Sequence, residues 1–227
     1  MNGTGKTNWV AIWISVAVVV VLVAIGGVVV WMNNQATGPG TAPQAGIVNE
    51  KTGAITIGDD DADNVLDEYV DFMCPICGQY FDLYGETVQG LVDSGDLKLN
   101  LHPISILDRY SQGTKYSTRA ANAMYCVADD SEDAVLPFLE LLFANQPEEQ
   151  SEGLTDAKLA ELASQAGADG AASCIEDGTY KRFVTAITEK TPVQPGQAGI
   201  GTPTVLLNDE FVTLSGDPQK DIVDQLR

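Results

Sequence analysis

The chain has few of the side chains that build metal centres and nucleic-acid surfaces. Its 227 residues include one histidine and four cysteines. Only 12 lysines and arginines stand against 32 aspartates and glutamates, which gives a net charge of −20 at pH 7. Such a surface repels nucleic acid and anionic lipid headgroups, and this argues against both as ligands. We expect the excess of carboxylates to keep the protein soluble.

Tryptophan is also scarce, and all three tryptophans lie near the N-terminus. Between Trp9 and Trp31, residues 10–30 read VAIWISVAVVVVLVAIGGVVV and carry no charge. As a helix this run would span roughly 31 Å, the thickness of a bilayer core, with the two tryptophans as interfacial anchors. The sequence therefore predicts a single-pass membrane anchor over 9–31. The alternative, a cleaved signal peptide, would need a shorter apolar run and a small-residue cleavage site.

The charges around this run predict its orientation. Lys6 precedes it, whereas no positive charge follows until Lys51. The positive-inside rule then places residues 1–8 in the cytoplasm and the rest of the chain outside the cell membrane. Residues 32–49 are rich in Gly, Pro, Ala and small polar residues, which predicts a flexible linker. Residues 50–227 suffice for one domain with a hydrophobic core.

The pattern of apolar residues in this domain indicates an α/β fold. Alternation predicts strands over 65–72 and 97–102, and a helix from about Pro75 connects them in a βαβ unit. Residues of about 111–196 show helical patterns and no strong strand pattern. The segment 202–226 then reads as strand, tight turn, strand and helix. The predicted order is βαβ, a helical block and ββα.

Two of the four cysteines, Cys74 and Cys77, lie three apart in DFMCPICGQYF, at the predicted helix start. There the first N–H groups and the helix dipole stabilise a thiolate on Cys74, and Cys77 can resolve a mixed disulfide one turn on. A CxxC pair is also half of a zinc site. The other half is missing, because Cys126 and Cys174 stand singly and His102, the one histidine, is expected on the open face of its strand. We predict no metal and no other cofactor.

This arrangement resembles the DsbA-like thiol-disulfide oxidoreductases of the thioredoxin superfamily, in the membrane-tethered form of Gram-positive and actinobacterial envelopes. The resemblance runs from about residue 46 to 227 and is strongest in EYVDFMCPIC and GTPTVLL. It implies a thioredoxin fold with an all-helical insertion between its two halves.

The resemblance also implies roles for residues outside the cysteine pair. Glu68, six positions before Cys74, corresponds to the buried acid of the superfamily and is expected to relay protons for Cys77. Pro203 is expected to be cis, with Thr202 facing the disulfide and offering main-chain pairing to a substrate peptide. The residues expected to bind substrate are Pro75, Ile76, Thr202 and Pro203.

One position departs from the family pattern. Many members carry histidine or tyrosine directly before the second cysteine, where this chain has Ile76. Histidine there can stabilise the thiolate and isoleucine cannot. How oxidising the pair is therefore stays open at the level of sequence.

The other two cysteines, Cys126 and Cys174, both lie in predicted helices of the insertion. They can be two buried free thiols, since cysteine often serves as a small apolar residue. An extracytoplasmic location favours a disulfide, and some actinobacterial relatives carry a similar second bridge. On the resemblance we predict a structural disulfide.

The leading functional hypothesis is a dithiol oxidase that forms disulfides in exported, cysteine-containing proteins and is regenerated by a quinone-linked membrane reoxidase. A disulfide reductase or isomerase of the same fold is the first alternative. A non-catalytic tethered binding or chaperone module is the second. No dimerisation domain is recognisable in the sequence, and a monomer is expected.

Overall fold

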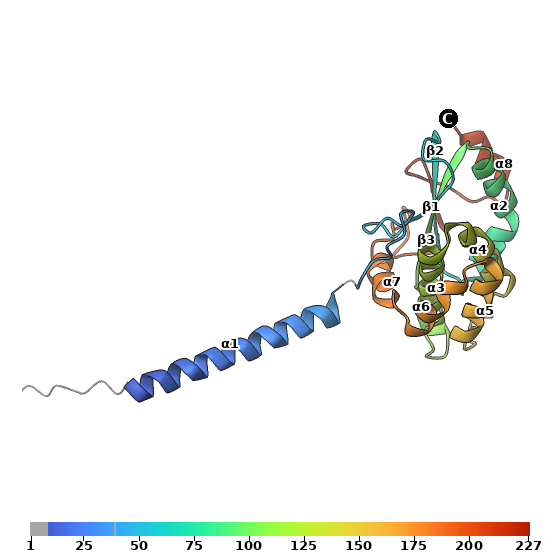
Figure 1. The fold of residues 1–227 in the computed structure, drawn as a ribbon. Helices are drawn as coiled ribbons and strands as arrows, with labels where there is room; N and C mark the ends of the chain where they lie inside the picture. The colour runs from blue at the N-terminus through green and yellow to red at the C-terminus, as the bar shows by residue number, and fades with distance from the viewer. Residues whose placement is uncertain (1–8, 39) are drawn as a thin grey trace, which may run out of the picture. The chain divides into compact units, whose positions relative to one another are not determined.

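The computed structural model describes residues 9–38 and 40–227. The predicted cytoplasmic segment 1–8 lies outside the described residues. The chain divides into two units, Met1–Gly38 and Pro39–Arg227 (Figure 1). Each unit is described by itself below.

The first unit consists of helix α1 (Trp9–Thr37). Its described side chains are exposed. Among the described residues, no helix combines the length and the apolar content that crossing a bilayer requires. The membrane anchor over 9–31 therefore stays a prediction.

The second unit begins earlier than the sequence indicates. Val48 is buried in the hydrophobic core, and Ala42, Ala45 and Ile47 pack against that core. The backbone N–H of Gln44 also donates to the Asp129 carboxylate at 2.7 Å. This corrects the predicted boundary at residue 50, because residues 40–49 belong to the compact unit. Small residues suggested a flexible linker, but at Gly40 the backbone lies so close to the insertion that an added Cβ atom would come 2.8 Å from Arg182 Cβ.

The second unit is built on a mixed sheet of five strands in the order β1-β3-β2-β4-β5. Strands β2 and β3 are parallel, and the other pairs are antiparallel. The first strand was not predicted from the sequence. The strands are β1 (Ile55–Ile57), β2 (Asn64–Val70), β3 (Leu97–Pro103), β4 (Thr204–Leu207) and β5 (Glu210–Phe211).

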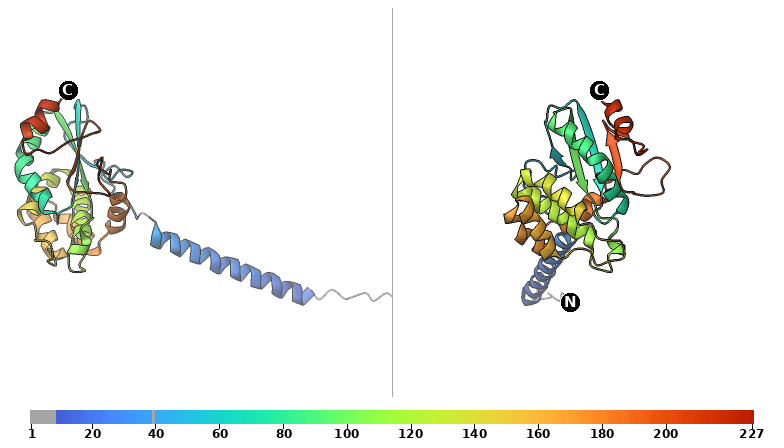
Figure 2. Two further views of the ribbon diagram at one scale, coloured as in Figure 1. Left: turned by 180° about the vertical axis from the view of Figure 1, so that it is seen from behind. Right: turned by 90° about the vertical axis from the view of Figure 1, so that its right-hand side faces the viewer.

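Helix α2 (Pro75–Asp93) connects β2 to β3, and α8 (Pro218–Asp221) follows β5. Figures 1 and 2 show both helices along one face of the sheet, with the insertion helices gathered near one end. The predicted order of βαβ, helical block and ββα is confirmed. The insertion includes the short α6, which carries Cys174. Its helices are α3 (Tyr116–Asp130), α4 (Val135–Ala144), α5 (Asp156–Ala166), α6 (Ala172–Asp177) and α7 (Lys181–Thr188).

The core beneath α2 follows from the alternation of residues along the strands. Alternate residues of β2 point to one face, and on this strand Leu66 and Val70 are buried. Leu66 packs in one cluster with Leu99 of β3 and Tyr84 of α2. Glu68 lies between the two apolar residues on the same face, and it is only 5% exposed. The strand pattern thus places a carboxyl group inside the core.

His102 differs from its prediction. The sequence suggested the open face of a strand, but its side chain is buried. Its Nε2 lies 2.9 Å from Asp67 Oδ1, and its ring stacks on Tyr69 with 4.0 Å between the centroids. The neighbouring strand therefore supplies both a polar partner and an aromatic cover, and these allow a histidine to be buried.

Candidate active site

The cysteine pair lies where β2 passes into α2. Cys74 is the N-cap residue of α2, with extended backbone angles (φ −76°, ψ 114°), and Pro75 follows within the first turn. Proline suits this position because the first helical N–H groups have no intrahelical partner. The Cys74 backbone N–H donates to Asp71 O at 2.9 Å and closes the preceding turn. The sulfur of Cys74 thus lies at the positive end of the helix.

The two thiols of the pair differ in acidity. The pKa of Cys74 is lowered to about 6, chiefly by a hydrogen bond from Cys77. Hydrogen bonds from Thr202 and from the backbone N–H groups of Ile76 and Cys77 act in the same direction, and burial opposes them. Burial raises the pKa of Cys77 well above its ordinary value, and the hydrogen bond with Cys74 adds to this.

The two thiols also differ in exposure. Cys74 is 6% exposed and Cys77 is 0% exposed. Both are free thiols in this structure. The site therefore combines a slightly exposed cysteine that readily forms a thiolate with a fully buried thiol one turn further along the helix. Such a pair suits thiol-disulfide exchange, in which the thiolate attacks a disulfide and the second thiol resolves the mixed disulfide.

The segment before β4 reaches the same sulfur from the other half of the sequence. The Thr202–Pro203 peptide bond is cis. Cys74 Sγ lies 3.5 Å from the carbonyl oxygen of Thr202, which is partly buried, and Pro203 is buried. Ile76, between the cysteines, is 55% exposed. The structure thus brings Pro75, Ile76, Thr202 and Pro203 to the cysteine pair.

Glu68 lies beneath α2. Its Oε1 accepts a hydrogen bond from the Tyr80 hydroxyl at 2.5 Å. Burial raises the pKa of Glu68 to about 7, and this hydrogen bond opposes the rise. Glu68 and Tyr80 also line a cavity of about 760 Å³ that extends to Leu136 and Leu139 of α4. The sequence did not single out Tyr80, because its contact with Glu68 joins two different elements.

Comparison with known proteins agrees with this geometry. The family described as Thioredoxin matches residues 50–225. The crystal structure of oxidised DsbA from Mycobacterium tuberculosis is 32% identical, with a TM-score of 0.67, and the match covers 75% of this chain and 90% of that chain. The chain belongs to the DsbA-like branch of the thioredoxin superfamily. The predicted thioredoxin fold with a helical insertion is therefore confirmed.

Two curated relatives extend the comparison. The serine/threonine-protein kinase PknE of Mycobacterium tuberculosis is 34% identical over 159 residues, or 66% of this chain. The match covers only 28% of the kinase, so this DsbA-like chain spans about a quarter of that relative's length. Disulfide bond formation protein D of Bacillus subtilis is 25% identical over 161 residues, which is 70% of each chain.

Asp71, a residue that the sequence analysis missed, fixes the turn before Cys74. Its side chain is buried, and Oδ1 accepts from Met73 N at 2.9 Å. Oδ2 accepts from the backbone N–H groups of Ile106 and Leu107 at 2.8 and 2.9 Å. The carboxylate therefore ties the active-site turn to the loop after β3. The sequence did offer a signal for Asp71, because a carboxylate within the apolar run VDFM is expected to be buried and hydrogen-bonded.

Gln146, which the sequence analysis also missed, reaches the site from the loop after α4. Its Nε2 donates to the carbonyl oxygens of Phe72 at 3.2 Å and Cys74 at 2.9 Å. A Cβ atom at position 78 would lie 2.4 Å from Gln146 Oε1, so a larger residue there would displace the Gln146 amide. No local pattern could indicate Gln146, because it lies 72 residues beyond Cys74.

The other cysteine pair forms a disulfide in the structure. Cys126 of α3 and Cys174 of α6 are bonded, with 5.7 Å between their Cα atoms. The bridge closes a loop with a sequence separation of 48. It connects two helices of the insertion and leaves Cys74 and Cys77 as the free cysteines of the described residues.

Alkylation of the reduced protein across a pH series should give a rate that is half-maximal near pH 6. The reason is that the pKa of Cys74 is lowered to about 6, whereas an unperturbed thiol has a pKa of about 8.5. Mass spectrometry should locate the label on Cys74, because the pKa of Cys77 is raised and its side chain is buried. A Cys74→Ser control should lose the reaction at low pH. A half-maximal rate near pH 8.5 would show that the pKa of Cys74 is not lowered and would contradict the prediction.

Proposed function

We propose that this protein is an extracytoplasmic thiol-disulfide oxidoreductase that acts as a dithiol oxidase on exported proteins. The observation that carries the proposal is the lowered pKa of Cys74 at the start of α2. An environment that stabilises the thiolate also stabilises the reduced state of the pair. The corresponding disulfide is then a stronger oxidant, since its reduction is more favourable.

The reaction in the oxidising direction is a two-step exchange. A substrate thiolate attacks Cys74 Sγ, the Cys74–Cys77 disulfide breaks, and the electron pair leaves on Cys77, which takes up a proton. A second substrate thiolate then attacks the substrate sulfur of the mixed disulfide. The substrate leaves as a disulfide, and Cys74 remains as a thiolate. Two electrons have passed from the substrate dithiol to the enzyme pair.

Other residues of the site have proposed roles in these steps. Glu68 supplies the proton to Cys77 in the oxidising direction and accepts it in the reverse direction, which its raised pKa of about 7 supports. The main chain at Thr202, 3.5 Å from Cys74 Sγ, pairs with the substrate peptide, and Pro203 shapes that segment. Pro75 and the exposed Ile76 contact the substrate beside the disulfide.

The location of the enzyme is part of the proposal. The uncharged run over 10–30 supports a single-pass anchor in the cell membrane, with residues 1–8 in the cytoplasm and the catalytic domain outside. The Cys126–Cys174 disulfide is consistent with an oxidising compartment. After each turnover a quinone-linked membrane reoxidase oxidises the reduced Cys74–Cys77 pair back to the disulfide. The protein acts as a monomer.

A disulfide reductase or isomerase is the second candidate, because Ile76 stands where a histidine would stabilise the thiolate further. The reduction potential separates the two candidates. Equilibration of the full chain with glutathione should give a potential well above that of thioredoxin, about −270 mV. Ile76→His should raise it further, since a cationic ring stabilises the reduced state. A value near that of thioredoxin would contradict the oxidase proposal and support the reductase.

A further inference from the structure

Tyr80 lies directly below the recessed cysteine. It follows Cys77 by three positions in α2, and residues three apart on a helix lie on the same face. Tyr80 is 5% exposed. Burial raises the pKa of its hydroxyl well above the ordinary value, and the charges of Glu68 and Cys77 add to this. The Tyr80 hydroxyl therefore stays protonated and acts as a donor at every physiological pH.

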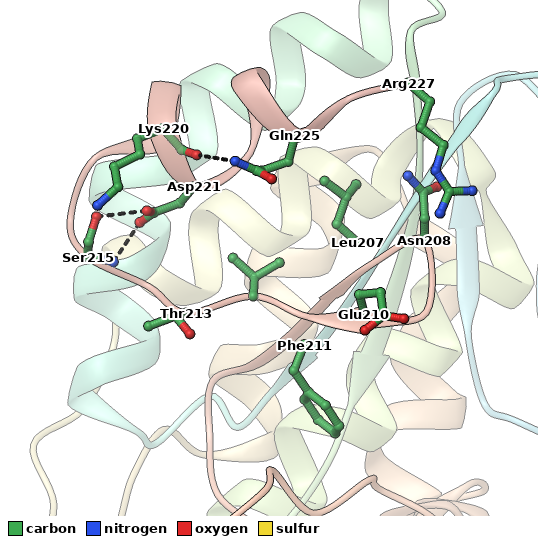
Figure 3. A pocket seen from close by; sticks show the side chains of 11 residues that line it. Leu207, Asn208, Glu210, Phe211, Thr213, Ser215, Lys220, Asp221, Gln225 and Arg227 are labelled. Atoms are coloured by element: carbon green, nitrogen blue, oxygen red, sulfur yellow. Dashed lines mark hydrogen bonds between the residues drawn. The ribbon is translucent and has the colours of Figure 1, made fainter.

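The orientation of the Tyr80 ring is fixed from the C-terminal end of the domain. Its ring stacks on Tyr84, with 4.7 Å between the centroids and 18° between the planes. The Tyr84 hydroxyl donates to Asp221 Oδ2 at 2.6 Å, and the N–H of Gly216 donates to Tyr84 Oη at 2.9 Å. Figure 3 shows Asp221 bonded in turn to Ser215. The ring that carries the donor to Glu68 therefore packs on a tyrosine that the C-terminal segment holds in place.

We propose that Tyr80 is a positioning residue whose hydroxyl holds the Glu68 carboxylate ready to exchange a proton with Cys77. The inference rests on the function proposed above for Glu68 and Cys77, and it assigns the part that Tyr80 contributes. In the reverse direction, Cys77 gives its proton to Glu68, and the new thiolate attacks Cys74 of a mixed disulfide. The Cys74–Cys77 bond forms as the bond to the substrate breaks, and the substrate leaves as a thiolate.

A tyrosine that only fills the core would be replaceable by phenylalanine at a cost in stability alone. Here the same change also leaves Glu68 without the hydrogen bond that stabilises its charged form. The hydrogen bond lowers the pKa of Glu68, so its loss must raise that pKa above the present value of about 7. A bond of this kind corresponds to a shift of about one unit or more.

The test measures the resolving step in the reduced full chain. Rapid mixing with oxidised glutathione, acid quenching and mass spectrometry follow the Cys74 mixed disulfide and its conversion to the intramolecular disulfide. In the unmodified protein, the conversion rate should rise with pH around 7. In Tyr80→Phe, the rise should move up by about one pH unit. Tyr125→Phe is the matched control, because it removes another buried hydroxyl, one that donates to Gly53 O at 2.7 Å and not to Glu68, and its midpoint should not move.

Glu68→Gln separates this inference from the proposed function. If Glu68→Gln leaves the pH profile unchanged, the proton role of Glu68 is wrong, and the role of Tyr80 falls with it. If Glu68→Gln removes the rise around pH 7 but Tyr80→Phe does not shift it, only the Tyr80 inference is overturned. In a Glu68→Gln background, Tyr80→Phe should cause no further change.

The contact can also be measured without a substitution at Tyr80, should Tyr80→Phe fold poorly. The hydroxyl proton of Tyr80 should exchange slowly enough to be seen by NMR in the unmodified full chain. Its resonance should move as Glu68 titrates near pH 7, and that movement should vanish in Glu68→Gln. A Tyr80 hydroxyl resonance whose chemical shift does not change as Glu68 titrates would overturn the inference.

Discussion

Cys77→Ala should convert the protein into a covalent trap for its substrates. Cys74 keeps its place at the helix start and can still attack a disulfide, but no neighbouring thiol is left to release the mixed disulfide. Turnover should fall by about a thousandfold or more, because an intramolecular attack is replaced by slow attack from solution. Non-reducing electrophoresis of the full chain from its own host, followed by mass spectrometry, should show adducts at Cys74.

Cys74→Ala is the matched control for the trap. It removes the thiol with the lowered pKa and keeps Cys77, which is 0% exposed, so adducts should be absent. The species that Cys77→Ala traps should include the proposed exported substrates and the proposed reoxidising partner. If Cys77→Ala forms no adduct, or if Cys74→Ala forms the same adducts, the exchange mechanism is contradicted. A non-catalytic binding module would then explain the chain better.

Removal of the Cys126–Cys174 disulfide should have the largest effect on stability. The bridge closes a loop with a sequence separation of 48. On the chain-entropy estimate, a loop of this size stabilises the folded state by about 4 kcal/mol. The free energy of unfolding of the double variant Cys126→Ala/Cys174→Ala should fall by that order in chemical denaturation. Alanine suits both helical positions, since it has high helix propensity.

The reactivity of Cys74 in the double variant tests whether the Cys126–Cys174 disulfide is purely structural. The alkylation midpoint of Cys74 should stay near pH 6 under conditions in which the variant is folded, because the groups that lower its pKa lie in α2 and at Thr202. Cys126→Ser/Cys174→Ser, with side chains closer in size to cysteine, should show a similar loss of stability. A loss below about 1 kcal/mol in both variants would contradict the entropic role.

Features that depend on neighbouring residues could be predicted from the sequence. The alternation in β2 placed Glu68 on an apolar face, and Pro75 indicated the start of α2. The spacing of Cys74 and Cys77 gave their order on the helix. These signals work because strand period, helix caps and a CxxC pair are each set within a few residues.

Features that depend on distant segments could not be predicted. Gln146 bonds to Cys74 across 72 positions, and Tyr80 meets Glu68 on a different element. Strand β1 has only three residues, too few to show a period. Residues 40–49 resembled a linker because their packing comes from the helices they contact, and composition does not report such contacts.

The hydrogen bond from Gln146 to the carbonyl oxygen of Cys74 connects the helical insertion directly to the backbone of the reactive cysteine. A sequence change that shifts the end of α4 would move that amide and alter how the first turn of α2 is presented. The insertion can therefore diverge in evolution to adjust the rate and potential of exchange while the CPIC motif itself stays the same. Residues after α4 are the place to look for differences in reactivity between relatives with identical cysteine motifs.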